Sequence, residues 1–267
     1  MLKTRALVAL VALPILVVLV VLGGWWFALF VLAALLLAGD EYVRLLRQGD
    51  HRPPGWLVLA LIALAWGAVW FEHPDWREPG LMALLIAGMF AAIWGMEHGE
   101  TQPIHNLALA AFGGVYIGWL GSTLVAVRML DDGAILTALL YGCVIVSDSG
   151  AYFVGRQWGR RKLSPHVSPK KTWEGYAGSI LTGILFGALA AVVGGIDALT
   201  IGHGAMIGLL IGVLGTVGDL GISAIKRQVG AKDSSNLIPG HGGILDRTDS
   251  VLVSAAIGYY YLVWFVV

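Results

Sequence analysis

The sequence predicts an all-α, polytopic integral membrane protein with about nine transmembrane helices, its N-terminus inside and its C-terminus outside. Three observations predict this fold. The 267 residues are 58% hydrophobic and only 13% charged, with a mean hydropathy of +0.79, whereas soluble domains carry about 25% charged residues. Long apolar segments recur from one end of the chain to the other. The Lys and Arg residues fall almost entirely in alternate connections between these segments.

The apolar segments set the expected number of helices. A helix that crosses a bilayer needs about 20 mostly apolar residues, with a lower limit near 17. The second and third segments are short, so they could form either a tilted pair of helices or partly re-entrant segments. The first resembles a signal peptide, but its apolar run is long and no A-x-A site follows, so we interpret it as an uncleaved helix. The nine segments are 5–22, 24–39, 56–71, 80–96, 105–127, 134–154, 175–195, 203–222 and 250–267.

The distribution of basic residues predicts the orientation. With a cytoplasmic N-terminus, 15 of the 17 Lys and Arg residues fall in inside segments, and only Arg77 and Arg128 lie outside. Such an excess is typical of the cytoplasmic side. A wrong number of helices would scramble this asymmetry. The sequence therefore predicts a multi-pass protein of the inner (plasma) membrane, with its long polar loops facing the cytoplasm.

Charged breaks divide the chain into three expected groups of helices. Residues 1–78 hold the first three, 79–132 hold the fourth and fifth, a candidate dimerisation region, and 133–267 hold the last four. The long loops 155–174 and 223–249 belong to the last group, where we expect the chemistry. Net charge is zero, so overall charge predicts no nucleic-acid partner. The single cysteine excludes an intramolecular disulfide and fits a small buried residue.

Small residues recur at a spacing of four in two apolar segments. Gly204, Gly208 and Gly212 form one series, and Gly114 and Gly118 form another. Such series let two helices approach closely. We favour packing within one subunit over a contact between subunits.

A polar run, Asp219 to Asp249, lies between two apolar segments. Asp219 lies near the end of the segment 203–222, and Asp246 and Asp249 stand where the next begins. Asp148 lies near the same predicted membrane face. An ionised aspartate at the centre of a spanning helix costs roughly 2.5–3.5 kcal/mol. We therefore expect these four acids to be neutralised by partners, protons or cations.

Helical spacing suggests what the acids do. Asp219, Ser223 and Lys226 share one face if the helix continues through the boundary, and Asp246 and Asp249 share a face of the next. Facing each other, these stripes would present oxygen ligands suited to Mg²⁺, with Lys226 and Arg227 beside them for phosphate. The alternative is salt bridging of the acids to Lys226, Arg227 or Arg247.

Two further segments are suited to phosphate. Residues 238–243 (IPGHGG) predict a turn whose backbone N–H groups can approach an anion, and its His241 is a candidate for phosphate contact or proton transfer. In 168–175 (SPKKTWEG), Thr172 is an expected helix N-cap. Lys170 and Lys171 would then lie at a positive helix end, which suits a nucleotide triphosphate. The alternative for this loop is attraction to anionic lipid.

These residues resemble the signature of the phosphatidate cytidylyltransferases, also called CDP-diacylglycerol synthases. The resemblance covers about residues 144–250 and includes the stretches SDSGAYFVGRQWG and SPKKTWEG. The first 130 residues are similar only in being hydrophobic helices. The signature reads Ser223-Ala-Ile-Lys226-Arg227, Lys232-Asp233, Ile238-Pro239-Gly240-His241-Gly242-Gly243 and Asp246-Arg247-Thr248-Asp249.

The resemblance implies transfer of the cytidylyl group of CTP to phosphatidic acid, giving CDP-diacylglycerol and pyrophosphate. It implies dependence on Mg²⁺, a second cation such as K⁺, and a homodimer. The expected catalytic residues are Lys226, Asp246, His241 and Arg247. The expected substrate-binding residues are Ser223, Arg227, Lys170, Lys171, Lys232, Gly242 and Gly243. The expected metal ligands are Asp219, Asp246, Asp249 and Asp148.

Three other functions are alternatives to this one. A membrane phosphotransferase acting on CDP-lipids should carry a paired DG/AR-type aspartate motif, which the sequence lacks. A transporter or channel should place its polar residues near the midplane, and here they lie at one interface. A non-catalytic scaffold would need none of them. Release of pyrophosphate from CTP separates the enzyme from the other two.

Overall fold

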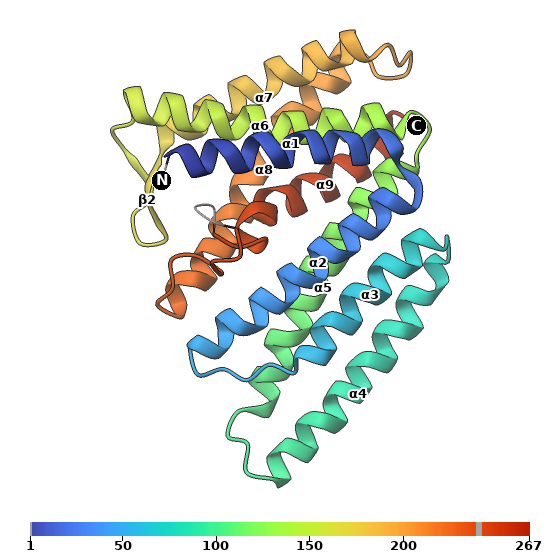
Figure 1. Ribbon diagram of the computed structural model, residues 1–267, viewed down its shortest axis with the longest axis vertical. Coiled ribbons are helices and arrows are strands. Elements are labelled where there is room, and N and C mark those ends of the chain that lie inside the picture. Colours follow the sequence, from blue (N-terminus) through green and yellow to red (C-terminus); the bar gives the residue numbers. More distant parts are fainter. Residues whose placement is uncertain (1, 239–241) are drawn as a thin grey trace. The chain divides into compact units, whose positions relative to one another are not determined.

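The computed structural model describes residues 2–238 and 242–267, and this part of the chain is mainly helical (Figure 1). The helical prediction is confirmed. The main element that the sequence did not predict is a short two-stranded hairpin. In chain order the elements are α1 (Leu2–Leu22), α2 (Gly24–Gln48), α3 (Gly55–Trp70), the 3₁₀ turn η1 (Pro74–Trp76), α4 (Arg77–Glu97), α5 (Pro103–Met129), α6 (Gly133–Trp158), β1 (Lys162–Ser164), β2 (Ser168–Thr172), α7 (Trp173–Gly194), α8 (Ile201–Gln228) and α9 (Leu245–Phe265).

Six helices in the described residues are long and apolar enough to cross a membrane, which makes this a multi-pass membrane protein. The apolar helices Ala12–Leu22 and Gly55–Trp70 are shorter, as expected for the third segment. The expectation that the second segment is short was wrong, because α2 runs on through the polar residues after it and has 25 residues. A count of nine spans and the N-in, C-out orientation stay predictions. The six helices are α2, α4 with its preceding 3₁₀ turn, α5, α6, α7 and α8.

The described chain forms two compact units, Met1–Ala126 with Lys226–Thr248, and Val127–Ile225 with Asp249–Val267. We describe each by itself. The three-group division predicted from the charged breaks stays a prediction.

In the first unit, α3 packs against α2 and α5 through glycines. A Cβ atom at Gly39 of α2 would lie 2.5 Å from the side chain of Ile62, and one at Gly118 of α5 would lie 2.8 Å from the Ile62 backbone. Gly114 approaches Leu61 in the same way. The series Gly114–Gly118 therefore packs within one subunit, as favoured from the sequence. Tyr42 of α2 is fully buried, and its hydroxyl donates to the Leu109 carbonyl of α5 at 2.9 Å.

In the second unit, the series on α8 packs against α7. Gly204 and Gly208 lie directly against Gly187 and Gly183, so a Cβ atom at any of the four would collide with the opposing backbone. This arrangement also confirms packing within one subunit. Apolar side chains fill the rest of this unit's core: Leu136, Leu139, Leu140 and Cys143 of α6, Ala191 of α7, Ile207 and Ile211 of α8, and Leu262 of α9.

The predicted cytoplasmic loop 155–174 contains an antiparallel hairpin, in which β1 pairs with β2. The polar strand residues gave no alternating hydrophobic pattern, so the sequence did not reveal it. The hairpin leads directly into α7. Thr172 caps this helix by accepting a hydrogen bond from the Gly175 N–H at 3.1 Å, which confirms the predicted N-cap. Glu174 in the first turn accepts from the Arg160 N–H at 3.0 Å and ties the start of the hairpin to the helix.

We expect Gly208→Ala to destabilise the protein by about 1–3 kcal/mol, because the added methyl group must displace the α7 backbone. Gly221→Ala is the matched control on the same helix, since nothing lies within 4 Å of its Cβ position. There the lower helix propensity of glycine predicts a gain of about 0.5–1 kcal/mol. Thermal unfolding in detergent measures both. Equal melting temperatures for the two variants would contradict the close packing.

Candidate active site

A cavity of about 490 Å³ opens in the second unit between the end of α6, the hairpin, the start of α7 and α8. Its volume lies within the range of about 300–1,000 Å³ common for small-molecule sites. Its wall carries both carboxylates and cations, which suits a phosphate bound together with a metal ion. The charged and hydroxyl-bearing lining residues are Asp148, Tyr152, Arg156, Lys170, Lys171, Thr172, Tyr176, Thr216 and Asp219.

Asp219 is the best-defined acid of this cavity. Its Oδ2 lies 2.7 Å from the Nζ of Lys171, and its Oδ1 accepts from the Ser223 hydroxyl at 3.2 Å. The second contact confirms that α8 continues through the boundary and places Asp219 and Ser223 on one face. The side chains of Lys171 and Asp219 are 26% and 34% exposed. This ion pair is therefore open to a ligand that enters the cavity.

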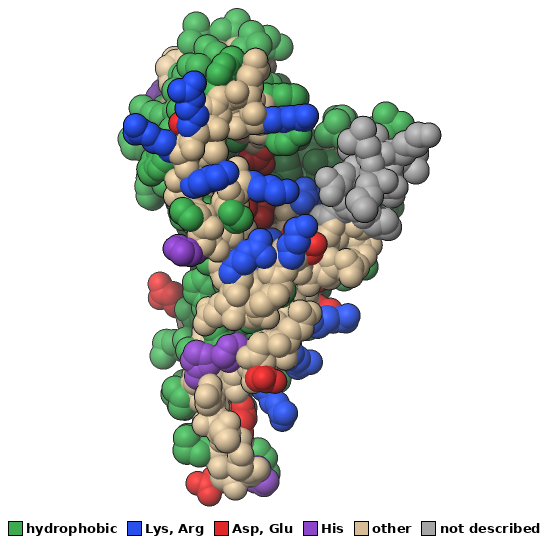
Figure 2. Space-filling view, turned by 90° about the vertical axis from the view of Figure 1, so that its left-hand side faces the viewer, with side chains coloured by type: hydrophobic (Ala, Val, Ile, Leu, Met, Phe, Trp, Pro, Cys, Tyr) green, Lys and Arg blue, Asp and Glu red, His purple; other side chains and the backbone are tan. Residues whose placement is uncertain are grey.

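Cations also line this cavity. Lys170 and Lys171 come from the end of β2, immediately before the N-terminus of α7, and Arg156 comes from the last turns of α6. The guanidinium of Arg156 donates to the Tyr152 hydroxyl at 2.9 Å. A helix N-terminus and adjacent ammonium groups attract anions. Lys and Arg side chains are also exposed elsewhere on the face drawn in Figure 2, with acidic side chains between some of them.

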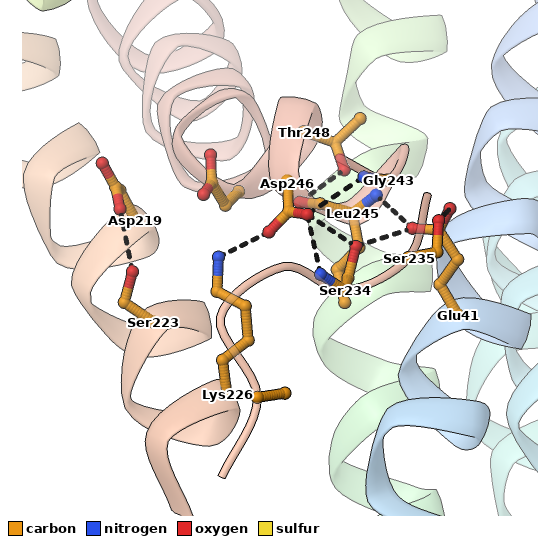
Figure 3. Close-up of polar contacts among 12 residues, drawn as sticks. Glu41, Asp219, Ser223, Lys226, Ser234, Ser235, Gly243, Leu245, Asp246 and Thr248 are labelled. Atoms are coloured by element: carbon orange, nitrogen blue, oxygen red, sulfur yellow. Dashed lines mark hydrogen bonds and ion pairs between the residues drawn. The ribbon is translucent and has the colours of Figure 1, made fainter. Parts of the chain in front are cut away.

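A second polar cluster lies in the first unit, around Asp246 at the start of α9 (Figure 3). Asp246 and Lys226 form a buried ion pair, with Oδ1 and Nζ 2.5 Å apart and the side chains 5% and 9% exposed. Oδ2 accepts from the N–H of Ser234 at 2.8 Å and the N–H of Gly243 at 3.0 Å. The salt-bridge alternative therefore holds for Asp246, whose two oxygens are engaged by the protein itself.

The surroundings of Asp246 determine its charge. Burial alone would raise the pKa of this carboxyl. The Gly243 N–H, the Lys226 ammonium and the Ser234 N–H outweigh burial and hold its pKa below the ordinary value. Asp246 therefore stays ionised at neutral pH, and its negative charge fixes the position of Lys226.

Glu41 of α2 was not among the candidates from the sequence. Its side chain is buried, and it accepts hydrogen bonds from Ser234, Ser235, Ile244 and Leu245 (Figure 3). The available signal was an acid just after the apolar segment 24–39. Periodicity along α2 does not reveal a contact with residues about 200 positions further along the chain.

The other expected site residues take different positions. Gly242 has a positive φ of 82° and pairs with Ile238, whose N–H donates to the Gly242 carbonyl. His241 lies outside the described residues. Asp249 is buried on α9, and its Oδ1 accepts from the Ser250 N–H at 2.8 Å. The backbone of Asp249 packs against Gly218, next to Asp219. Three expected substrate-binding or catalytic residues are exposed: Arg227, Lys232 and Arg247.

The residues of the cavity fit a magnesium ion. Within the described parts of the chain, no three or more His, Cys, Asp and Glu side chains are grouped to hold a metal ion. Mg²⁺ in nucleotide sites, however, needs only one or two protein carboxylates, because substrate phosphates and water complete its shell. Asp148 and Asp219 line one cavity and supply two carboxylates. Sharing of one ion site by all four aspartates stays a prediction.

Comparison with known proteins agrees with this chemistry. The model of a family described as the cytidylyltransferase family matches residues 3–265. A phosphatidate cytidylyltransferase of Bacillus subtilis (strain 168) is 32% identical, with 98% of each chain covered. Proteins of the same name from Synechocystis sp. and Pseudomonas aeruginosa are 31% and 34% identical, covering 97% and 99% of this chain and 96% and 97% of their own. This chain therefore belongs to the cytidylyltransferase family and is an enzyme of the nucleotidyltransferase class.

Proposed function

We propose that this enzyme transfers the cytidylyl group of CTP to phosphatidic acid, giving CDP-diacylglycerol and pyrophosphate. The observation that carries the proposal is the 490 Å³ cavity, whose wall combines two carboxylates with Arg156, Lys170 and Lys171. Its charges suit a triphosphate bound with a divalent cation. The names of the relatives supply the acceptor, because all three are phosphatidate cytidylyltransferases.

The cavity residues have separate tasks in nucleotide binding. Lys170, Lys171 and Arg156 bind phosphate oxygens, since ammonium and guanidinium groups form strong charge-assisted hydrogen bonds with them. Asp148 and Asp219 would hold Mg²⁺, which supplies charge neutralisation on the phosphates and orients the leaving group. Lys171 pairs with Asp219 at 2.7 Å. One of the phosphate-binding cations therefore lies directly beside a proposed metal ligand. When CTP binds, Lys171 exchanges this carboxylate for a phosphate oxygen.

The reaction needs no covalent protein intermediate. An oxygen of the lipid phosphate attacks the α-phosphorus of CTP and forms a new P–O bond. The bond from that phosphorus to the β-phosphate oxygen breaks in line, and pyrophosphate leaves with the electron pair. Cationic side chains stabilise the negative charge that moves onto the leaving group. Lys226, a residue of the family signature held in place by Asp246, is proposed to stabilise the leaving group. Substrate contact stays a prediction for four further residues: Ser223, Arg227, Lys232 and Arg247.

The lipid acceptor fits a multi-pass membrane enzyme, because phosphatidic acid stays in the bilayer while CTP comes from water. The excess of Lys and Arg in one set of loops supports a site that faces the cytoplasm from the inner membrane. A homodimer, a second cation such as K⁺, and roles for His241, Gly242 and Gly243 stay predictions from the family resemblance.

The direct test is pyrophosphate release. We expect the purified protein in detergent to release pyrophosphate from CTP only when both phosphatidic acid and Mg²⁺ are present, with CDP-diacylglycerol formed in equal amount. Phosphatidylcholine is the matched lipid control. Its phosphate is a diester and is less nucleophilic than the phosphomonoester of phosphatidic acid. If the protein shows no turnover under these conditions, the result would contradict the proposed function and favour a transporter or a non-catalytic scaffold.

We expect Lys171→Ala to weaken CTP binding and lower turnover by about 10²–10³-fold, the typical loss for one positioned charge-stabilising group. Lys162→Ala is the matched control, because Lys162 lies in the same hairpin, is exposed and does not line the cavity. Steady-state rates and a CTP-dependent rise in melting temperature measure the two effects. If both lysines could be replaced with equal tolerance, the cavity would not be the nucleotide site.

A further inference from the structure

Glu41 is a buried carboxylate, 4% exposed, that joins α2 to a distant part of the chain. Oε1 accepts from the Ser235 hydroxyl at 2.7 Å and the Ile244 N–H at 3.0 Å, and Oε2 accepts from the Ser234 hydroxyl at 2.9 Å and the Leu245 N–H at 2.8 Å. In the described residues, these four donors are all neutral. The proposed mechanism uses none of them directly.

This arrangement explains how an acid is tolerated without a cationic partner among the described residues. A buried carboxylate is strongly unfavourable unless hydrogen bonds replace its hydration. Here two hydroxyl and two N–H donors replace it, and hydrogen bonds to a charged group are stronger than those between neutral groups. Ile244 and Leu245 provide the N–H groups at the start of α9, where the helix dipole also favours an anion. Glu41 therefore caps α9 from another helix.

The same backbone also holds Asp246. The hydroxyl of Ser234 lies 2.9 Å from Glu41 Oε2 and 3.0 Å from Asp246 Oδ2, and the Ser234 N–H donates to Asp246. The Gly243 N–H donates to Asp246, while the next N–H, from Ile244, donates to Glu41. At Gly243 a Cβ atom would collide with both Ser234 and Glu41. The two carboxylates thus hold one loop between them (Figure 3).

We propose that Glu41 is a positioning residue for cytidylyl transfer. It fixes Ser234 and the segment 243–245, and these in turn hold Asp246, which places the ammonium of Lys226. This inference rests on the proposed function, because its test measures the proposed cytidylyl transfer. Glu41 itself touches neither substrate nor metal in this assignment, so its loss should slow the reaction without changing how CTP binds.

Glu41→Gln tests this assignment, because the amide keeps the shape but replaces one acceptor oxygen with a donor that faces other donors. We expect kcat per folded protein to fall by about 10–100-fold, as found for groups that orient functional side chains. KM for CTP should change by less than roughly threefold, since ground-state binding is untouched. Asp40→Asn is the matched control: Asp40 precedes Glu41 on α2, and its carboxylate pairs with Arg44 one turn along the same helix, at 2.8 Å.

The outcomes separate the two proposals. If the unmodified protein releases no pyrophosphate, the proposed function fails and the assignment of Glu41 falls with it. If it is active and Glu41→Gln matches Asp40→Asn in kcat, with only a lower melting temperature, Glu41 is merely structural and the inference is overturned. Should Glu41→Gln not fold, Ser234→Ala decides. It removes a single hydroxyl that bridges both carboxylates, and an unchanged kcat would overturn the inference in the same way.

Discussion

Asp219→Ala is expected to abolish measurable turnover while the protein keeps its fold. Asp219 lines the cavity, pairs with Lys171 and accepts from Ser223. Its removal takes away a proposed Mg²⁺ ligand and frees Lys171 from its partner. The loss of one group at such a site typically costs about 10²–10³-fold in rate, and the loss of the metal position adds to it. Pyrophosphate release over a range of Mg²⁺ concentrations measures the effect.

The fold should survive this substitution, because Asp219 is about a third exposed and its ion pair is at the edge of the cavity. Exposed pairs contribute only about 0–1 kcal/mol. Asp197→Asn is the matched control, an exposed acid in the connection between α7 and α8 outside the cavity. A melting temperature near that of the control, with turnover lost, supports the assignment. Near-normal turnover of Asp219→Ala at low Mg²⁺ would remove Asp219 from the metal site.

Asp246→Asn is expected to destabilise the protein by about 3–5 kcal/mol and also to stop turnover. The Lys226 ammonium is buried with Asp246 as its ion-pair partner, and breaking a buried pair leaves an uncompensated charge. The asparagine oxygen can still accept from the N–H groups of Ser234 and Gly243. The stability loss therefore isolates the missing charge. Denaturant unfolding in mixed micelles gives the free energy of unfolding.

The double variant Lys226→Met with Asp246→Asn separates stability from catalysis. Without the ammonium, no buried charge is left unpaired, so we expect most of the lost unfolding free energy to return. Turnover should stay absent, because the cation proposed to stabilise the transferred phosphate is gone. Asp40→Asn, which opens the exposed pair with Arg44, should change stability by less than about 1 kcal/mol. Recovery of turnover in the double variant would show that the pair is structural only.

Much of the helical architecture follows from local composition. The segments predicted at 134–154 and 203–222 lie within α6 (Gly133–Trp158) and α8 (Ile201–Gln228). Both helices extend beyond the apolar run, because polar residues outside the membrane core still form helix, and Lys226 and Arg227 favour the C-terminal end of α8. The expected loop 223–249 is correspondingly shorter. The β1–β2 hairpin was missed, since its pairing depends on cross-strand contacts and on the start of α7.

The candidate site was only partly predictable. Residue types and spacing identified Lys170, Lys171, Asp219 and Ser223, and the structure brings Lys171 onto Asp219. The sequence left Asp246 between metal binding and salt bridging, and the structure pairs it with Lys226. Whether Asp246 binds a metal or forms a salt bridge depends on the donors around its carboxylate. These donors are Lys226 of α8 and the N–H groups of Ser234 and Gly243.

By itself, the sequence determined that this chain is a bundle of apolar helices with a polar, phosphate-binding signature, because hydropathy and residue spacing are local properties of the chain. Tertiary structure alone decided which groups compensate each buried charge. Glu41 shows why: its partners are 193 to 204 residues away, and its burial is tolerated only because the fold brings two serine hydroxyls and the first N–H groups of α9 to its oxygens.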